Sequence, residues 1–334
     1  MNLDLKDIQI IYLLSKNARE NNLKIGKEVN LSSDSVRNRI EKLKNIGIIK
    51  AYKTNINYKK LGLSEYDIYL KLKNYTQEEL KKIIDLICQN RCVTWVGTCF
   101  GKYDLRISLV VNNIIDINEF IRILKNNIKE YFVEYKILYL LEKYKIDQKK
   151  IVTNLLGNKF DKIKINKNEQ AKNIFENNNE NIFKLEKQDK EIIRELNQKP
   201  EISLVELSRK IKLTPEGCKY RIEQLKKNGI ITSFGAIIDG NKLNKIWAVF
   251  LFKIENENSK ELINFIKNEN NVSAFLHLLG DWNYSVTVFA DNVQEIHNIL
   301  MNFRNKFPEI IKEYELILLF ETFKYPSIPD IVFE

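Results

Sequence analysis

The sequence is poor in the residues that build several common kinds of site. Its 334 residues include 4 cysteines and 2 histidines, too few for a disulfide-rich scaffold or a multi-metal enzyme. Glycine (11) and proline (5) are also scarce, which argues against glycine-rich nucleotide loops and turn-dense β-sandwiches. No apolar run approaches the roughly 18–20 residues that a membrane helix needs, and residues 1–7 lack the apolar segment of a signal peptide. We therefore expect a soluble, cytoplasmic protein with no membrane partner.

The composition that remains indicates a folded, basic chain. Hydrophobic residues make up 44% of the sequence, which excludes a wholly disordered protein. The length predicts two or three domains. Lysine and arginine exceed aspartate and glutamate by 54 to 44, giving a net charge of +10. A positive charge of this size suits a polyanionic partner but says nothing about the fold.

An internal repeat is the most informative feature of the sequence. The segment Val36–Ile49 reappears as Cys218–Ile231, at an offset of 182 residues. Further along, Gly101-Lys-Tyr-Asp matches Gly280-Asp-Trp-Asn at an offset of 179 residues. These offsets are far longer than the period of a solenoid repeat. The pattern therefore predicts one multi-domain unit that occurs twice.

Each unit opens with three short helical patterns. The third begins at an N-cap residue, Ser32 in the first copy and Thr214 in the second, and it ends at Gly47 or Gly229. Gly26 lies in the second helical pattern, where a small residue lets two helices cross closely around a tight turn. This order is typical of a helix-turn-helix domain.

The rest of each unit predicts the order strand, helix, strand, strand, helix, strand. Two split β-α-β halves in this order form a ferredoxin-like sandwich, with both helices on one face of an antiparallel sheet. The other face stays open, and strands such as Ile137–Leu141 are apolar on both sides, so we expect a partner on that face. The fold class is α+β, with two copies of a helix-turn-helix domain followed by a ferredoxin-like β-α-β-β-α-β sandwich. The expected segments are helix-turn-helix domains at 1–58 and 183–240, ferredoxin-like domains at 59–146 and 241–326, and a linker at 147–182.

The exposed N-terminal ends of the two third helices are candidate DNA-reading surfaces, because helix-turn-helix proteins read the major groove with them. Arginine and asparagine can contact guanine and adenine edges. Lysines contact phosphates, as we expect for Lys42, Lys44, Lys50 and Lys53. The first domain has 11 basic and 6 acidic residues and the second 12 and 9, and Gly217 weakens the second helix, so we expect the first copy to bind more strongly. The alternative is that these residues form ordinary solvated helix faces. The candidates are Ser33, Asp34, Ser35, Arg37, Asn38, Arg39, Lys44, Lys219, Tyr220 and Arg221.

The segment Leu31–Ile49, followed by Leu61-Gly62 and by Gly101–Leu105, resembles the Lrp/AsnC (leucine-responsive, or feast/famine) family of transcriptional regulators. The resemblance covers nearly the whole chain twice over, except for the linker and the C-terminal tail. It implies a regulator that binds double-stranded DNA and responds to a small-molecule effector such as an amino acid. It also implies an intrachain pseudo-dimer in which the two open sheet faces pack on each other, with further homo-oligomerisation.

The family's effector site lies near the turn between the second and third strands of the ferredoxin-like domain. The resemblance therefore implies an effector site in each copy. Asp104 in the first copy corresponds to Asn283 in the second, and this change removes a carboxylate that could pair with an α-amino group. The alternative is that the glycine and the aromatic residue only shape and pack a tight turn. The residues concerned are Gly101, Tyr103, Asp104, Gly280, Trp282 and Asn283.

An enzyme built on the same fold is the alternative to a regulator. Sirohaem decarboxylases of haem biosynthesis resemble the Lrp/AsnC family and should carry clustered arginines and histidines for a substrate with many carboxylates. The ferredoxin-like domains contain few arginines and histidines. We expect His277 to be an ordinary strand residue. Cys88 and Cys92 are four apart without a second pair, so we expect buried thiols and no metal site. No catalytic constellation or cofactor motif is found, and we predict a protein that is not an enzyme. The arginines are Arg91, Arg106, Arg122 and Arg304.

Overall fold

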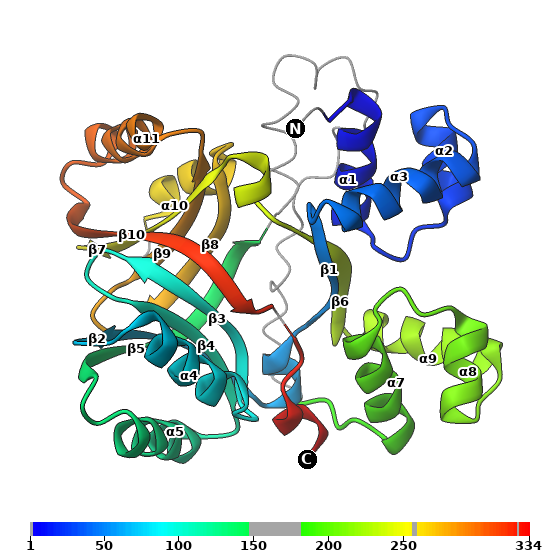
Figure 1. Cartoon of the computed structure of the whole chain (residues 1–334), viewed down its shortest axis with the longest axis horizontal. Helices are drawn as coiled ribbons and strands as arrows, with labels where there is room; N and C mark the ends of the chain where they lie inside the picture. Colours follow the sequence, from blue (N-terminus) through cyan, green and yellow to red (C-terminus); the bar gives the residue numbers. More distant parts are fainter. Residues whose placement is uncertain (1–2, 147–181, 256–258, 326) are drawn as a thin grey trace.

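The computed structural model describes residues 3–146, 182–255, 259–325 and 327–334, and the chain forms two helical domains beside a strand-rich body (Figure 1). The linker predicted at 147–182 lies outside the described residues except for Ile182. The described parts contain the predicted unit twice.

Both helix-turn-helix domains have the predicted caps. Ser32 accepts a hydrogen bond from the Ser35 amide, and Thr214 accepts one from the Gly217 amide. Gly47 has a φ of +77°, which is the left-handed conformation that ends a helix. A Cβ atom on Gly26 would lie 2.5 Å from the Leu31 carbonyl oxygen, so the turn requires glycine there. The helices are α1 (Leu5–Lys16), α2 (Asn22–Val29), α3 (Ser33–Asn45), α7 (Lys187–Gln198), α8 (Leu204–Ile211) and α9 (Pro215–Lys227).

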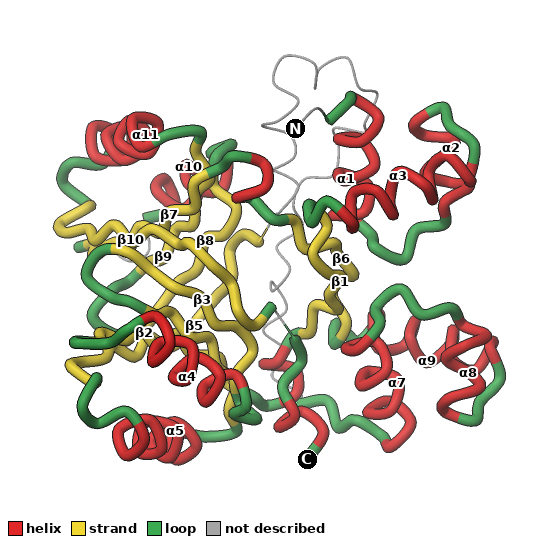
Figure 2. The backbone as a smooth tube through the Cα atoms, in the orientation of Figure 1, coloured by secondary structure: helices red, strands yellow, loops and turns green. Residues whose placement is uncertain are grey.

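A two-stranded ribbon joins the helix-turn-helix domains, which lie on one side of the molecule (Figure 2). It consists of β1 (Ile49–Ile56) and β6 (Ile231–Ile238), which pair antiparallel. Each domain packs its first helix against the strand of the other copy. The Ala18 amide after α1 donates to the Phe234 carbonyl at 3.1 Å, and the Thr54 hydroxyl donates to the Leu196 carbonyl of α7 at 2.8 Å. The sequence analysis did not predict this pairing.

The ferredoxin-like order is confirmed in both copies. The helices lie outside the strands and cover them (Figure 1), and each buries one apolar face, as Ile83, Ile84 and Ile87 of the first helix show. The first copy contains β2 (Ser64–Leu72), α4 (Gln77–Cys88), β3 (Val93–Phe100), β4 (Leu105–Val111), α5 (Ile114–Asn127) and β5 (Phe132–Ile146). The second contains β7 (Ile246–Ile254), α10 (Lys260–Asn268), β8 (Val272–Leu279), β9 (Tyr284–Ala290), α11 (Val293–Lys306) and β10 (Ile311–Lys324).

The sequence analysis predicted two separate sheets packed face to face. In the structure the two sheets instead join edge to edge. The strand order β10-β3-β4-β2-β5-β8-β9-β7 closes into one eight-stranded barrel. The reason is strand length, because β5 and β10 are 15 and 14 residues long. The first half of β5 pairs with β2 and the remainder with β8, while β10 pairs first with β7 and then with β3. Backbone groups that an edge strand would leave unpaired are thereby satisfied across the seam.

The sequence analysis left one apolar face of each sheet without a partner in its own domain. In the structure these faces form the inside of the barrel. One buried cluster contains Leu138 and Leu140 from β5 together with Ile317 and Leu319 from β10, and it includes Tyr69 of β2. Inward-facing side chains fill the interior of small barrels. The two open faces were expected to pack on each other as separate sheets, whereas the structure joins them in one closed barrel.

The C-terminal tail contacts both the second helix-turn-helix domain and the first ferredoxin-like domain. A 3₁₀ turn, Asp330–Phe333, lies against α7 at the bottom of the view in Figure 1. The Lys190 ammonium donates to the Phe333 carbonyl at 3.3 Å, and the Arg194 guanidinium lies over the Phe333 ring. The Ser327 amide donates to the Thr94 carbonyl of β3. The tail therefore attaches the second helix-turn-helix domain to the first ferredoxin-like domain.

Candidate nucleic-acid interface

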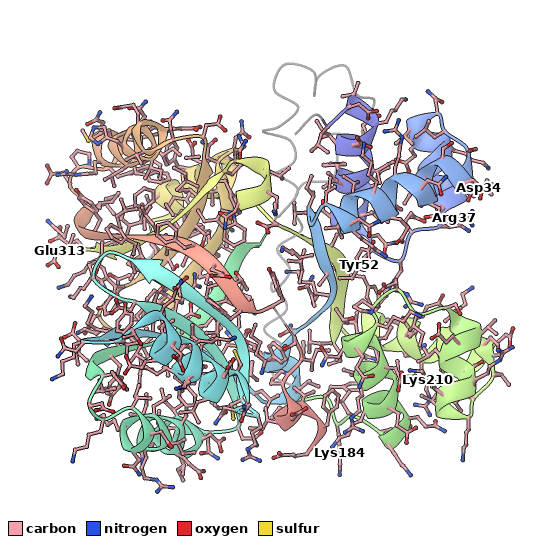
Figure 3. All side chains as sticks on the ribbon, in the orientation of Figure 1. Asp34, Arg37, Tyr52, Lys184, Lys210 and Glu313 are labelled. Atoms are coloured by element: carbon pink, nitrogen blue, oxygen red, sulfur yellow. The ribbon has the colours of Figure 1, made fainter. Side chains whose placement is uncertain are left out.

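The outer face of α3 presents Arg37 and Asn38 to solvent. The Arg37 guanidinium lies 2.8 Å from the Asp34 carboxylate, and both side chains are well exposed, at 64% and 76% (Figure 3). An exposed pair of this kind is weak, so the guanidinium can exchange its partner for a base or a phosphate. Ser33 and Ser35 are partly exposed in the first turn of the same helix.

Arg39 faces inward, unlike Arg37. Its guanidinium donates to the Asp4 and Asp7 carboxylates of the first helix at 2.7 and 2.6 Å, and Asp7 is only 2% exposed. The hydrogen bonds to Asp4 and Asp7 raise the pKa of Arg39 above its usual value. This arginine therefore attaches the third helix to the first. It is not on the DNA-reading face where the sequence analysis placed it.

Arg221 repeats this arrangement in the second copy. It donates to Glu186 and Asp189 at 3.0 Å each, and Asp189 is buried. The structure thus takes Arg221 out of the exposed face as well. A signal was present in the sequence, because each arginine stands 32 residues after its buried aspartate in both copies. Lys219 and Tyr220 remain exposed on α9.

The lysines expected to contact phosphates are placed in different ways. Lys42 is exposed. Lys44 lies 3.3 Å from the Glu41 carboxylate and its ammonium is 5.2 Å from the centre of the Tyr52 ring, and Lys50 pairs with Asp239 across the ribbon. Lys53 is turned away from the helices and lines a cavity under the ribbon, so the expectation of a phosphate contact there is wrong.

A cleft of about 500 Å³ separates the two helix-turn-helix domains. Ser33, Arg37 and Lys44 of the first domain line one side, and Glu201 and Ser203 of the second line the other. Near its base, Arg19 donates to the Pro200 carbonyl at 2.6 Å. The two domains are therefore in direct contact beside the cleft.

The turn residues that the family resemblance implied as an effector site are largely used by the fold. Tyr103 is buried in the barrel, and the Asp104 carboxylate accepts hydrogen bonds from the Leu72 amide and the Tyr75 hydroxyl at 2.8 Å each. Asn283 accepts the equivalent bond from the Ile254 amide at 2.8 Å. The aspartate-to-asparagine change therefore preserves a structural contact. This geometry favours the interpretation that these residues shape and brace the turn.

Both turns lie on the seam between the copies. Gly101 and Gly280 have φ values of +126° and +142°. A Cβ atom on Gly101 would lie 3.1 Å from the Leu316 carbonyl of β10, and one on Gly280 would lie 3.2 Å from the Ile137 carbonyl of β5. Glycine is required there for its conformation and for the close approach of the opposite strand. Trp282 packs partly against the barrel's inner cluster.

The cysteines and histidines considered in the sequence analysis do not come together as a metal or catalytic site in the described part of the chain. Within the described ranges, no three or more histidine, cysteine, aspartate or glutamate side chains are grouped to hold a metal ion. Burial raises the pKa of the Cys92 thiol to about 11, so that thiol is protonated at neutral pH. The His277 ring stacks on the Tyr144 ring, with the two centres 6.0 Å apart. No helix in the described part of the chain is long and apolar enough to span a bilayer.

The arginines of the ferredoxin-like domains are dispersed and do not form one pocket. Arg106 pairs with Asp67 inside the barrel, Arg91 pairs with Glu334 of the tail, and Arg122 lies near Glu119 on its own helix. Arg304 lies over the Tyr314 ring. A substrate with many carboxylates would require several such cations on one surface.

Comparisons with known proteins agree with this geometry. Residues 3–44 match the family described as the AsnC-type helix-turn-helix domain, and residues 185–232 match winged helix-turn-helix DNA-binding. An uncharacterised helix-turn-helix transcriptional regulator of Pyrococcus horikoshii is 30% identical over 123 residues, 36% of this chain and 81% of that protein. The transcriptional regulator AzlB of Bacillus subtilis is 30% identical over 122 residues, 35% of this chain and 78% of that protein.

One solved structure is similar over almost the whole length. The sirohaem decarboxylase NirDL superposes with a TM-score of 0.61, covering 98% of this chain and 96% of its own, at 14% sequence identity. Likeness at that level of identity concerns the fold alone.

Two capped helix-turn-helix domains, matched by helix-turn-helix families and by regulators, define a DNA-binding transcriptional regulator. The chain belongs to the Lrp/AsnC family of such regulators. It carries the family's unit twice.

Proposed function

We propose that the chain binds double-stranded DNA sequence-specifically as a covalent pseudo-dimer, with one reading helix from each half. The ribbon of β1 and β6 carries this proposal, because it joins both helix-turn-helix domains on the same side of the barrel (Figure 1). Two reading helices on one side of a rigid body can enter successive major grooves of one duplex. The closed barrel supports the proposal by making the two halves one folding unit.

The proposed contact residues are those that the structure leaves on the outer helix faces. In the first copy these are Arg37 and Asn38, with Ser33, Asp34 and Ser35 in the first turn of α3. In the second copy they are Lys219 and Tyr220, the latter 63% exposed. Arginine and asparagine can each form bidentate contacts with base edges, whereas lysine mainly binds phosphates. The first copy is therefore the stronger candidate for sequence recognition.

A salt-titrated gel shift of the full chain against genomic fragments tests this proposal. We expect a tight complex with a sequence preference, weakening steeply as salt rises. Replacing Arg37 and Asn38 with alanine should weaken specific binding by about 10–100-fold, and replacing Lys219 and Tyr220 should weaken it less. Binding with no preference over random DNA would refute the regulator, and equal losses would refute the ranking of the two helices.

A response to an amino acid or a similar small molecule belongs to the same proposal, as does further oligomerisation. The relevant surface is the pair of turns at Gly101 and Gly280, which lie on the seam of the barrel. Gel shifts with and without a panel of amino acids test the response. Repeating them after replacement of Lys102, which lies beside the first turn, tests whether the effector binds at that turn. Unchanged DNA affinity across the panel would remove this part of the proposal.

A sirohaem decarboxylase is the second candidate, because NirDL has the same fold over almost the whole chain. The scattered arginines argue against it, because no surface collects them. Incubating the purified chain with sirohaem and measuring released CO₂ decides between the two. Turnover would establish the enzyme, whereas specific DNA binding without turnover would support the regulator.

A further inference from the structure

A cavity of about 280 Å³ lies between the ribbon and the barrel. Lys53 to Ile56 of β1 form its ribbon side, and residues of the barrel strands form the rest. Its volume is near the lower end of the range for small-molecule sites. A molecule the size of one amino acid suits a space of this volume.

The cavity contains one positive charge that the described residues do not balance. Asp67 pairs with Arg106 at 2.7 Å and accepts a hydrogen bond from Ser108 at 2.6 Å, and Glu65 pairs with Lys143. Lys53 has neither a carboxylate nor a hydrogen-bond acceptor among the described residues. Burial and the neighbouring Lys143 lower its pKa to about 8. An anion in the cavity would supply the missing partner.

Apolar and aromatic side chains form part of the walls around these charges, beside several hydroxyl groups. Trp95 and Trp247 line the cavity together with Leu140, Leu276 and Phe289. The Trp247 and Phe289 rings meet edge to face, with centres 4.8 Å apart. A ligand for this space therefore combines one anionic group with an apolar body.

The second copy shows that the fold does not require these charges. At the offset of 182 residues, Gly235 takes the place of Lys53, and the two pair across the ribbon. At the same offset, Val249 takes the place of Asp67, and at the offset of 179 Ser285 takes the place of Arg106. Buried ion pairs commonly stabilise a protein no better than apolar residues of the same size. Because only one copy keeps the charges, we look for a role other than stability.

We propose that this cavity binds a small monocarboxylate with an aromatic or aliphatic body, whose carboxylate pairs with Lys53. A single unmatched cation suits one negative charge, whereas a phosphate monoester carries closer to two. An α-ammonium group would have to compete with Arg106 and Lys143 for the carboxylates of Asp67 and Glu65. The site therefore favours a simple carboxylate over the corresponding amino acid.

Binding at this position would connect the barrel to the ribbon. The ligand would contact β1 on one side and the barrel strands on the other, so its presence would restrict movement of the ribbon that carries both helix-turn-helix domains. This coupling to DNA binding rests on the proposed function. Binding to the cavity does not.

Titration of the full chain with 3-phenylpropionate, followed by tryptophan fluorescence and calorimetry, tests the site. L-phenylalanine adds only an ammonium group to this probe, and 2-phenylethylamine replaces its carboxylate. We expect saturable binding of 3-phenylpropionate, binding of L-phenylalanine at least about tenfold weaker, and no binding of the amine. No saturation up to about 10 mM would overturn the proposal. So would competition by inorganic phosphate at equal concentration, because it would show an unselective anion site.

Lys53→Met should weaken 3-phenylpropionate binding at least about tenfold, and Lys53→Arg should restore part of it. Lys81→Met is the matched control, since Lys81 is exposed on α4 and its loss changes the net charge equally. Equal binding by Lys53→Met and the wild type would overturn the proposal. Gel shifts with 3-phenylpropionate separately test whether the ligand affects DNA binding. Fluorescence measures binding in the cavity even if the chain does not bind DNA, so the failure of one proposal can be told from the failure of the other.

Discussion

Asn197 holds Ile328 with both ends of its side-chain amide. Its Nδ2 donates to the Ile328 carbonyl at 2.9 Å, and its Oδ1 accepts from the Ile328 amide at 2.8 Å. Asn197 lies in the last turn of α7, the first helix of the second helix-turn-helix domain, and Ile328 belongs to the tail. This pair therefore fixes the position of a DNA-binding domain through a segment that follows the last strand of the barrel.

Replacing Asn197 with alanine should loosen this attachment. Two hydrogen bonds are lost, and we expect the chain to lose about 1–2 kcal/mol of stability, with faster amide hydrogen exchange in α7 and in residues 327–334. Gln198→Ala is the control, because Gln198 is the exposed neighbour on the same helix. Unchanged exchange in the tail of Asn197→Ala would show that the other contacts of the tail, such as those of Lys190 and Arg91, hold it without Asn197.

Replacing Arg39 and Arg37 separately should divide stability from DNA binding. Arg39→Ala leaves the buried Asp7 carboxylate without its cation, so we expect a loss of about 2–3 kcal/mol in urea denaturation. Arg37→Ala removes only an exposed pair and should leave stability within about 0.5 kcal/mol of the wild type, while weakening DNA binding. If both variants were equally stable, the inward role of Arg39 would be wrong.

Lys53→Met should stabilise the chain in a pH-dependent way. The folded pKa of about 8 lies below the ordinary value of 10.5, so the folded state carries the full penalty of a buried charge below pH 8. Between pH 8 and 10.5 the folded chain releases this proton before the unfolded chain does, and the penalty disappears as the pH rises. The gain from Lys53→Met should be on the order of 1–3 kcal/mol at pH 7 and should shrink toward pH 10.

Thermal melts from pH 6 to about pH 10 measure this effect, with Lys81→Met as the charge-matched control. A gain that stayed constant over that range would indicate better packing by methionine and not relief of a buried charge.

Gly26→Ala should disrupt the first helix-turn-helix domain. The new Cβ atom would lie 2.5 Å from a backbone oxygen, which a side-chain rotation cannot relieve, so we expect a loss of more than about 2 kcal/mol. Gly229→Ala is the comparison: its φ is +72° but nothing lies within 4 Å of the new atom, so about 1 kcal/mol is expected. Calorimetric melts of the two variants rank them, and equal losses would contradict the close crossing at Gly26.

The sequence allowed prediction of the features that depend on local chemistry. The caps at Ser32 and Thr214 were predictable because a capping side chain bonds to an amide within three residues. The strand and helix order was predictable because each copy independently showed it. Closure of the barrel was not predictable from the sequence. It depends on which edge strand extends beyond its partner, as β5 extends beyond β2 to pair with β8.

Residue roles on one helix were harder to predict than the helix itself. Arg37 and Arg39 lie two positions apart and differ only in the direction that the helix gives them, outward or toward Asp7. Lys53 was misplaced because both faces of the ribbon are covered, one by the helices and the other by the barrel. Strand alternation cannot distinguish two covered faces, so only the assembled structure shows the cavity.

The two helices proposed to read DNA belong to one chain and are not identical, since Arg37 and Asn38 stand where the second copy has Lys219 and Tyr220. A symmetric homodimer reads a palindrome, and its two orientations on DNA are equivalent. This chain has no such equivalence, and its domains cannot be exchanged or reassorted with another subunit. A DNA site for it is expected to have two unlike halves, so that the bound protein points in one direction along the duplex.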